Sequence, residues 1–234
     1  ALASYKLAMR EFPKSKFYDH ALLKVGSIFD EIGYNLEARA LYNQGIKSKP
    51  KSLYNEARKN SLAAMLMKEG RLEKAFSAFQ KILRKAPKNI EAKAGIFEIA
   101  EKFFAKKDYS RALKIFEAGA SRWPGELNEK PEINFSMAEI YFSQKKYERA
   151  RKHFFRLLNL DPASKNAHKA LNRIGDSYMV EGKYQHALSV FDESGKKLGI
   201  KFDDEGKPVR DEEGFLIRED SADTQYGKIR MADI

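Results

Sequence analysis

Apolar positions recur along most of the chain with the spacing of an α-helix. Leu22, Val25 and Phe29 are three and four residues apart, and the same spacing returns within residues 96–103. This spacing places side chains on one helical face. Glycines or polar pairs separate the helical segments, at Gly33, Gly70, Lys107-Asp108, Lys145-Lys146 and Gly182. The pattern predicts a chain of short helices joined by tight turns.

The helical segments form a repeat of 37 or 38 residues, which is marked by regularly spaced prolines: Pro13, Pro50, Pro87, Pro124 and Pro162. A tyrosine or phenylalanine lies eight residues before each proline, and an alanine lies four residues before that aromatic, as at Ala38 and Tyr42. Another small residue precedes the alanine by twelve residues in each complete unit: Gly26, Ala63, Ala100, Ala138 and Gly175.

Each unit is interpreted as a helix, a turn and a second helix that proline ends. The small residues allow the two backbones to approach, and the aromatic fills the space beside them. One such hairpin cannot bury its apolar face, so the predicted fold is all-α, an α-solenoid of stacked antiparallel helix pairs. It comprises a lone second helix at 1–15, five units at 16–52, 53–89, 90–126, 127–164 and 165–200, and a short irregular acidic segment at 201–234.

The repeat resembles the tetratricopeptide family over roughly residues 1–195, through Leu22, Val25-Gly26, Phe29, Ala38, Tyr42 and Pro50, and again through Leu171, Ile174-Gly175, Tyr178, Gly182, Ala187 and Phe191. The slot that usually holds tryptophan is filled by other residues, and the period exceeds the family's 34 by about three residues. The longer period predicts a first helix that is nearly one turn longer than usual. The resemblance implies a noncatalytic superhelical scaffold whose first helices line a concave groove for a protein or peptide.

The groove surface is predicted from a stripe made of the position that follows each small residue of a first helix, together with the positions four before and three after it. In its central and later parts this stripe holds Phe97, Glu101, Phe104, Phe135, Glu139, Phe142, Asn172, Asp176 and Met179. If exposed, these side chains form an apolar and acidic surface of the kind that marks a partner site. We expect it to take an amphipathic helix or extended segment whose Lys or Arg side chains meet the carboxylates. The alternative is that the phenylalanines pack between successive units.

Charge leaves a second function class open. The net charge is +11, but residues 201–234 hold ten acidic and six basic residues, a net charge of −4, so the preceding body is strongly basic. Basic stretches at 81–88 and 145–152 make a nucleic-acid-binding helical repeat the alternative function. The acidic segment is interpreted as a cap, as an insertion that leads to further repeats, or as a flexible tail. A segment of this charge could also fold back on the basic body or, by self-association, bind a neighbouring molecule.

The sequence carries no signature of catalysis, cofactor binding or metal binding. It lacks cysteine, and its four histidines show no paired ligand spacing. No phosphate loop, dinucleotide fingerprint or nucleophile elbow is present. The carboxylates at Glu101 and Glu139 recur because the surface repeats, so an acid–base pair is not expected. The predictions are therefore no catalytic residue, no metal and no cofactor.

Two expectations concern the natural context of the chain. Residues 1–13 match only the second helix of a unit, so we expect the natural protein to continue N-terminally. No apolar run is long enough to span a membrane. Phe12-Pro13-Lys14-Ser15 and the long units resemble bacterial envelope members of the family. A periplasmic or envelope-associated location is therefore expected ahead of a cytoplasmic one.

Overall fold

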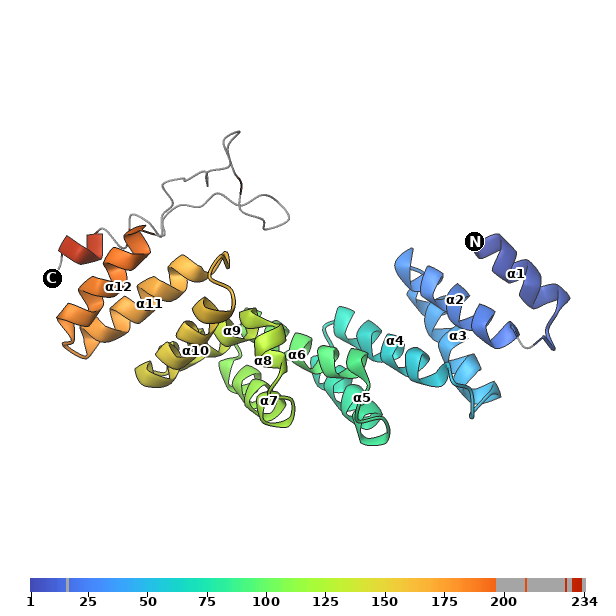
Figure 1. Cartoon of the computed structure of the whole chain (residues 1–234). Helices are drawn as coiled ribbons and strands as arrows, with labels where there is room; N and C mark the ends of the chain where they lie inside the picture. Colours follow the sequence, from blue (N-terminus) through green and yellow to red (C-terminus); the bar gives the residue numbers. More distant parts are fainter. Residues whose placement is uncertain (16, 197–208, 210–225, 227–228, 233–234) are drawn as a thin grey trace. The chain divides into compact units, whose positions relative to one another are not determined.

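The computed structural model describes residues 1–15, 17–196, 209, 226 and 229–232. Throughout this part of the chain the regular structure is helical and no strand occurs (Figure 1). The fold is an all-α solenoid of helix pairs, as predicted. Contacts divide the chain into two compact units, Ala1–Lys102 and Phe103–Ile234. From here on these are called the first and the second unit, as distinct from the five repeat units, and each is described by itself.

The first unit contains two complete helix pairs. Within each pair the helices contact one another, α2 with α3 and α4 with α5, while α3 contacts α4 and α1 contacts α2. The helices are α1 (Leu2–Glu11), α2 (Tyr18–Glu31), α3 (Asn35–Ser48), α4 (Asn55–Lys68), α5 (Leu72–Lys85) and the start of α6 (Ile90–Ala105). Stacking between pairs buries the faces that a single hairpin would expose.

The second unit repeats the arrangement, with α9 paired to α10 and α11 paired to α12. Helix α10 contacts α11, and α9 contacts both α7 and α11. The helices are α7 (Tyr109–Arg122), the one-turn α8 (Glu126–Glu129), α9 (Pro131–Ser143), α10 (Tyr147–Leu160), α11 (Ala167–Val180) and α12 (Tyr184–Lys196). The first helices α9 and α11 therefore lie next to each other, which determines the surface described below.

The residues that mark the repeat form its core, as the pattern predicted. In the five complete repeat units the marker alanines are fully buried, and the aromatics that follow them are at most 2% exposed: Tyr42, Phe79, Phe116, Phe154 and Phe191. A Cβ atom added to Gly26 would lie 2.6 Å from the Tyr42 ring, and one added to Gly175 would lie 2.4 Å from the Phe191 ring. Both distances are shorter than any normal contact, so the missing side chain is what allows the helices to cross.

The predicted turns between paired helices require a left-handed backbone. Gly33, Gly70 and Gly182 have φ angles between 71° and 87°. Lys107 and Lys145 occupy the equivalent places with φ of 60° and 59°. Glycine adopts this conformation at no steric cost, whereas a lysine there is less favourable. A residue with positive φ thus occupies each of these five turns, whether it is glycine or lysine.

The expectation of elongated first helices is wrong. The first helices have 13 to 16 residues and their partners have 13 or 14. The additional residues of the repeat lie mainly in the linkers between pairs, such as residues 49–54 and 161–166. These linkers turn through successive backbone hydrogen bonds, including Ser52 N–H to Lys49 O and Asn55 N–H to Ser52 O.

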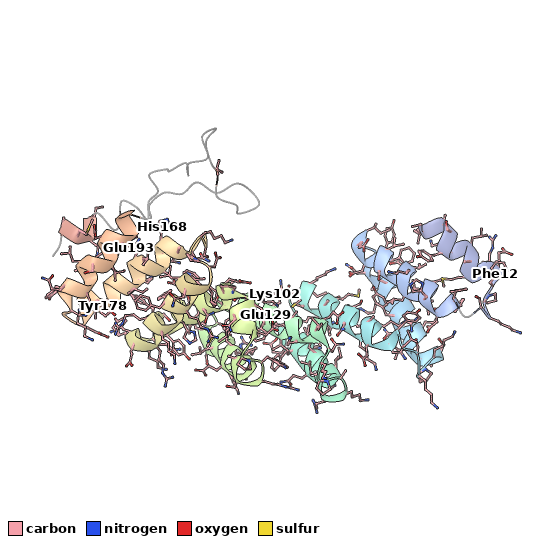
Figure 2. All side chains as sticks on the ribbon, in the orientation of Figure 1. Phe12, Lys102, Glu129, His168, Tyr178 and Glu193 are labelled. Atoms are coloured by element: carbon pink, nitrogen blue, oxygen red, sulfur yellow. The ribbon has the colours of Figure 1, made fainter. Side chains whose placement is uncertain are left out.

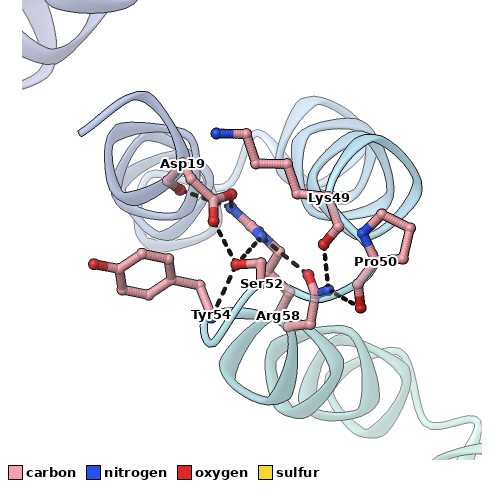
Figure 3. A network of polar contacts seen from close by, with 7 residues as sticks. Asp19, Lys49, Pro50, Ser52, Tyr54 and Arg58 are labelled. Atoms are coloured by element: carbon pink, nitrogen blue, oxygen red, sulfur yellow. Dashed lines mark hydrogen bonds and ion pairs between the residues drawn. The ribbon is translucent and has the colours of Figure 1, made fainter. Parts of the chain in front are cut away.

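A buried ion pair joins α2 to α4 in the first unit (Figure 3). The Arg58 guanidinium has no exposed surface and donates to the Asp19 carboxylate and, at 2.7 Å, to the Asp19 carbonyl. It also donates to Asn55 Oδ1 at 3.0 Å, and Ser52 donates to Asp19. Burial alone would raise the pKa of Asp19, but the hydrogen bonds from Ser52 and Arg58 hold this pKa below its usual value.

Gly45 makes room for this ion pair, because a Cβ at that position would lie 2.4 Å from the Arg58 guanidinium. The pair therefore takes part in the stacking of α3 on α4 as well as in the contact with α2.

A second polar group, centred on the half-buried His153, links helices of the second unit. The His153 ring on α10 stacks on Tyr141 of α9 with a centroid distance of 5.5 Å, and its Nδ1 lies 3.2 Å from Asn134 Oδ1. The Tyr141 hydroxyl donates to Glu117 of α7 at 2.6 Å, and burial together with this bond raises the Tyr141 pKa to about 12. Burial, with nearby Arg156, lowers the pKa of His153 to about 4.

This histidine predicts a loss of stability in mild acid. Histidine in the unfolded chain has a pKa of about 6.5, so between about pH 6.5 and 4 the unfolded chain binds a proton at His153 and the folded chain does not. This proton binding favours the unfolded state. When the pH falls from about 7.5 to about 5, the free energy of unfolding of the wild type should decrease by about 1 to 2 kcal/mol more than that of His153→Gln. Urea unfolding followed by Trp123 fluorescence measures this difference in the second unit. Parallel pH profiles would contradict the prediction.

Candidate functional site

Two carboxylates of the predicted stripe, Glu139 and Asp176, belong to a group of four charged residues on α9 and α11. Glu139 on α9 lies 3.3 Å from Lys169 and 3.2 Å from Arg173, both on α11. Arg173 also lies 3.8 Å from Asp176, one turn further along α11. The carboxylate side chains are 15% and 11% exposed, whereas the two cations are more open. We call these four residues the charge cluster.

Aromatic rings support the two cations of the charge cluster. The Arg173 guanidinium lies 4.8 Å from the centroid of the Phe142 ring, and the Lys169 ammonium lies 5.2 Å from that of Phe135. Cation–π attraction of this kind stabilises a fixed side-chain position. Phe142 itself lies edge-on against Tyr147, with 5.4 Å between ring centroids. The cations are therefore held in place by both the carboxylates and the rings.

Two residues of the C-terminal segment reach Asp176. The Tyr226 hydroxyl lies 2.9 Å and 3.0 Å from the two carboxylate oxygens and donates to them, and Arg230 Nε lies 3.4 Å from one of those oxygens. Burial and the Asp176 carboxylate raise the pKa of Tyr226. A small hollow of about 150 Å³ remains beside these groups, lined by Lys169, Asn172, Arg173, Asp176 and Tyr226. The surface thus already contacts side chains from outside the helix pairs.

Two predicted groove phenylalanines are not exposed. Phe97 is 2% exposed and Phe135 is 7% exposed. The expectation that these rings form an open apolar patch is wrong, because they lie in the core. Phe104 and Phe142 are half-buried and pair with Tyr109 and Tyr147. The apolar part of the predicted surface is therefore smaller than the sequence suggested.

The surface is also less acidic than expected. Glu139 and Asp176 are both paired within the chain, so the expectation of open carboxylates is wrong in the second unit. Asn172 is buried and accepts a hydrogen bond from Ser194 at 3.2 Å. Met179 and, in the first unit, Glu101 are half-buried. A partner-binding role for the residues of the stripe stays a prediction.

Sequence reasoning overlooked the cations that accompany the carboxylates. Lys169, Arg173 and Asp176 are spaced by four and three residues, so their common helical face could have been recognised. Tyr226 and Arg230 are also four residues apart. Their contact with α11 had no comparable signal, because fifty positions separate Tyr226 from Asp176.

Another face of α11 carries a different polar cluster, near Tyr178 (labelled in Figure 2). Arg151 of α10 lies 4.4 Å from the Tyr178 ring centroid and donates to Ser177 at 2.9 Å and to Glu181 at 3.0 Å. A wide hollow of about 790 Å³ lies beside it, lined by residues of both charges. These bonds join α10 to α11, so this cluster stabilises the stacking of one pair on the next.

The basic stretch at 81–88 borders a hollow of about 540 Å³ between α4 and α5. Its floor is apolar, with Leu62, Leu66 and Ile82, and basic side chains surround it. No aromatic residue is among those that line it. Single-stranded nucleic acids are usually bound by aromatic platforms beside basic grooves. The geometry here therefore does not favour the nucleic-acid alternative.

Among the described residues, no group of three His, Cys, Asp or Glu side chains is placed to hold a metal ion. Within the same residues, no helix is both long and apolar enough to cross a membrane.

Comparison with known families identifies the repeat. A tetratricopeptide repeat model matches residues 103–174, which include the charge cluster apart from Asp176. Residues 103–174 are thus similar to tetratricopeptide repeats. No curated protein matches the chain in sequence. Tetratricopeptide proteins present extended concave surfaces to other molecules and act as protein-interaction scaffolds.

Solved tetratricopeptide structures share the fold at low sequence identity. MamA of strain AMB-1 is 17% identical with a TM-score of 0.55, covering 78% of this chain and 92% of its own. YrrB, described as a TPR protein with an unusual peptide-binding site, is 15% identical with a TM-score of 0.56, covering 84% and 93%. A tetratricopeptide repeat protein from Parabacteroides merdae is 20% identical with a TM-score of 0.52, covering 84% and 72%.

Proposed function

We propose that the chain is a noncatalytic scaffold whose second unit binds a helical or extended segment of a partner protein across α9 and α11. The binding surface comprises the charge cluster with the half-buried Phe142 and Met179 beside it. One observation carries the proposal: Asp176 accepts contacts from Tyr226 and Arg230, which lie outside the helix pairs. A surface that accommodates these side chains has the chemistry to accept similar ones from another protein.

The charge cluster favours specificity over bulk attraction. Arg173 lies between two carboxylates, so an arriving basic side chain can join Asp176 or Glu139 while an acidic one can join Lys169. Partly buried charges that are already oriented lose little side-chain entropy when a partner adds a further pair. The peptide-binding site described for YrrB supports a similar use of this fold. The partner we propose is a protein segment with basic and apolar side chains.

A random library of displayed peptides, selected against the full chain, tests this proposal. Selected peptides should bind the double variant Glu139→Gln and Asp176→Asn at least about tenfold more weakly than the wild type, because both changes remove charge while preserving shape. Glu148→Gln is the matched control, because that exposed carboxylate lies on α10. Selected peptides that bind the double variant and the wild type equally would refute the proposed surface. Circular dichroism verifies that each variant is folded.

A further inference from the structure

We infer that the α9–α11 surface recognises a helical segment with tyrosine and arginine one turn apart, and that the chain's own Tyr226 and Arg230 occupy it as an internal ligand. This inference rests on the proposed function and names the class of partner that the surface fits. A partner with the same two side chains would compete with the C-terminal segment for Asp176.

The positions of Tyr226 and Arg230 relative to Asp176 support this class of ligand. Tyr226 and Arg230 are four residues apart, which is the spacing that places two side chains on the same face of a helix. Both converge on one carboxylate, with the Tyr226 oxygen 2.9 Å from Asp176 Oδ1 and Arg230 Nε 3.4 Å from the same atom. One hydrogen-bond donor and one cation, four residues apart, thus meet the same carboxylate, which is a pattern that a helix of another protein can reproduce.

Asp176 is well suited to receive both side chains. Its side chain is 11% exposed, so solvent screens it only partly. An ionised carboxylate offers about four acceptor positions. Arg173, the cation on its own helix, lies 3.8 Å away and is nearer to Glu139, at 3.2 Å. The Asp176 carboxylate therefore retains capacity for the phenol and guanidinium that the C-terminal segment supplies.

Bulk electrostatics does not account for this contact. Residues 201–234 have a net charge of −4 and the rest of the chain is basic, so simple attraction would bring acidic side chains of the segment to lysines or arginines. The described contact instead places a basic side chain of the segment, Arg230, on the acidic Asp176. A contact that runs against the overall charge pattern depends on the particular side chains involved.

Fluorescence anisotropy with a labelled peptide of residues 222–234 tests the inference on the full chain. The peptide should bind the variant Tyr226→Ala/Arg230→Ala at least about tenfold more tightly than the wild type, whose own segment competes. Adding Asp176→Asn to this variant should weaken binding at least about tenfold, and so should replacing Tyr226 and Arg230 of the peptide with phenylalanine and glutamine. Glu148→Gln in the same background should leave binding unchanged.

Several results would contradict the inference. Equal binding to the wild type and the Tyr226→Ala/Arg230→Ala variant would overturn the internal occupancy, and binding that ignores Asp176→Asn would overturn the ligand class. A wild-type chain that sediments as a dimer, with the double variant a monomer, would show that the segment binds a second copy and would overturn the intramolecular placement. If library-selected peptides need Asp176 but the 222–234 peptide does not bind, the inference fails and the proposed function stands. If neither the library-selected peptides nor the 222–234 peptide needs Asp176 for binding, both the inference and the proposed function fail.

Discussion

Replacing Arg58 with methionine should lower the free energy of unfolding of the first unit by about 3 to 5 kcal/mol. The variant keeps the volume of the stem but leaves the Asp19 carboxylate, which is 10% exposed, without its cation. It also removes the bonds to the Asp19 carbonyl and Asn55. Urea unfolding followed by far-ultraviolet circular dichroism measures the loss.

A double variant separates the loss of charge pairing from the loss of packing. Adding Asp19→Asn to Arg58→Met removes the unpaired charge, so it should restore part of the lost stability, on the order of 1 to 2 kcal/mol. If the double variant is as unstable as the single one, packing rather than charge is the main contribution. If Arg58→Met has the same free energy of unfolding as the wild type, the Asp19–Arg58 pair does not stabilise the first unit.

Replacing Gly175 with alanine should destabilise the second unit by about 1 to 3 kcal/mol, although alanine is the better helix former by about 1 kcal/mol. The added methyl group would lie 2.4 and 2.5 Å from atoms of the fully buried Phe191 ring, so α11 and α12 would have to move apart. Urea unfolding followed by Trp123 fluorescence measures the change in this unit.

Gly125 provides the matched control for this substitution. It lies in the same unit with a φ of −64°, and the nearest atom to an added Cβ is 4.0 Å away. Gly125→Ala should therefore be neutral or stabilising by up to about 1 kcal/mol. Should the two alanine variants change stability equally, the close crossing of α11 and α12 would not explain the glycine in the repeat.

The sequence was sufficient to predict the repeat core because its signal is local and recurs five times. Each alanine and the aromatic one turn later are on the same helical face, and in the five complete repeat units these pairs are buried as predicted. The turn positions were predicted for a similar reason, since Gly33, Gly70 and Gly182 have the positive φ that glycine allows. The boundaries of the individual units and the compartment stay predictions.

Surface predictions were less successful because helical spacing gives the direction of a side chain but not the depth of its surroundings. Phe135 lies on the predicted stripe, yet α9 is buried over most of its circumference, including Asn134 and Ser136. The Asp19–Arg58 pair spans 39 positions, and no local pattern connects them. Tyr226 is even further from Asp176 in the sequence, at 50 positions. Such contacts depend on how the helix pairs stack, which a single sequence does not display.

Site-specific photo-crosslinking tests the central claim most directly. A benzophenone side chain placed at Met179, on the α9–α11 surface, should crosslink to a library-selected peptide, whereas the same group at the exposed Phe155 of α10 should not. Mass spectrometry of the crosslinked product identifies the position that reacted. Crosslinking from Phe155 and none from Met179 would contradict the proposed binding surface, even if the peptide binds the chain tightly.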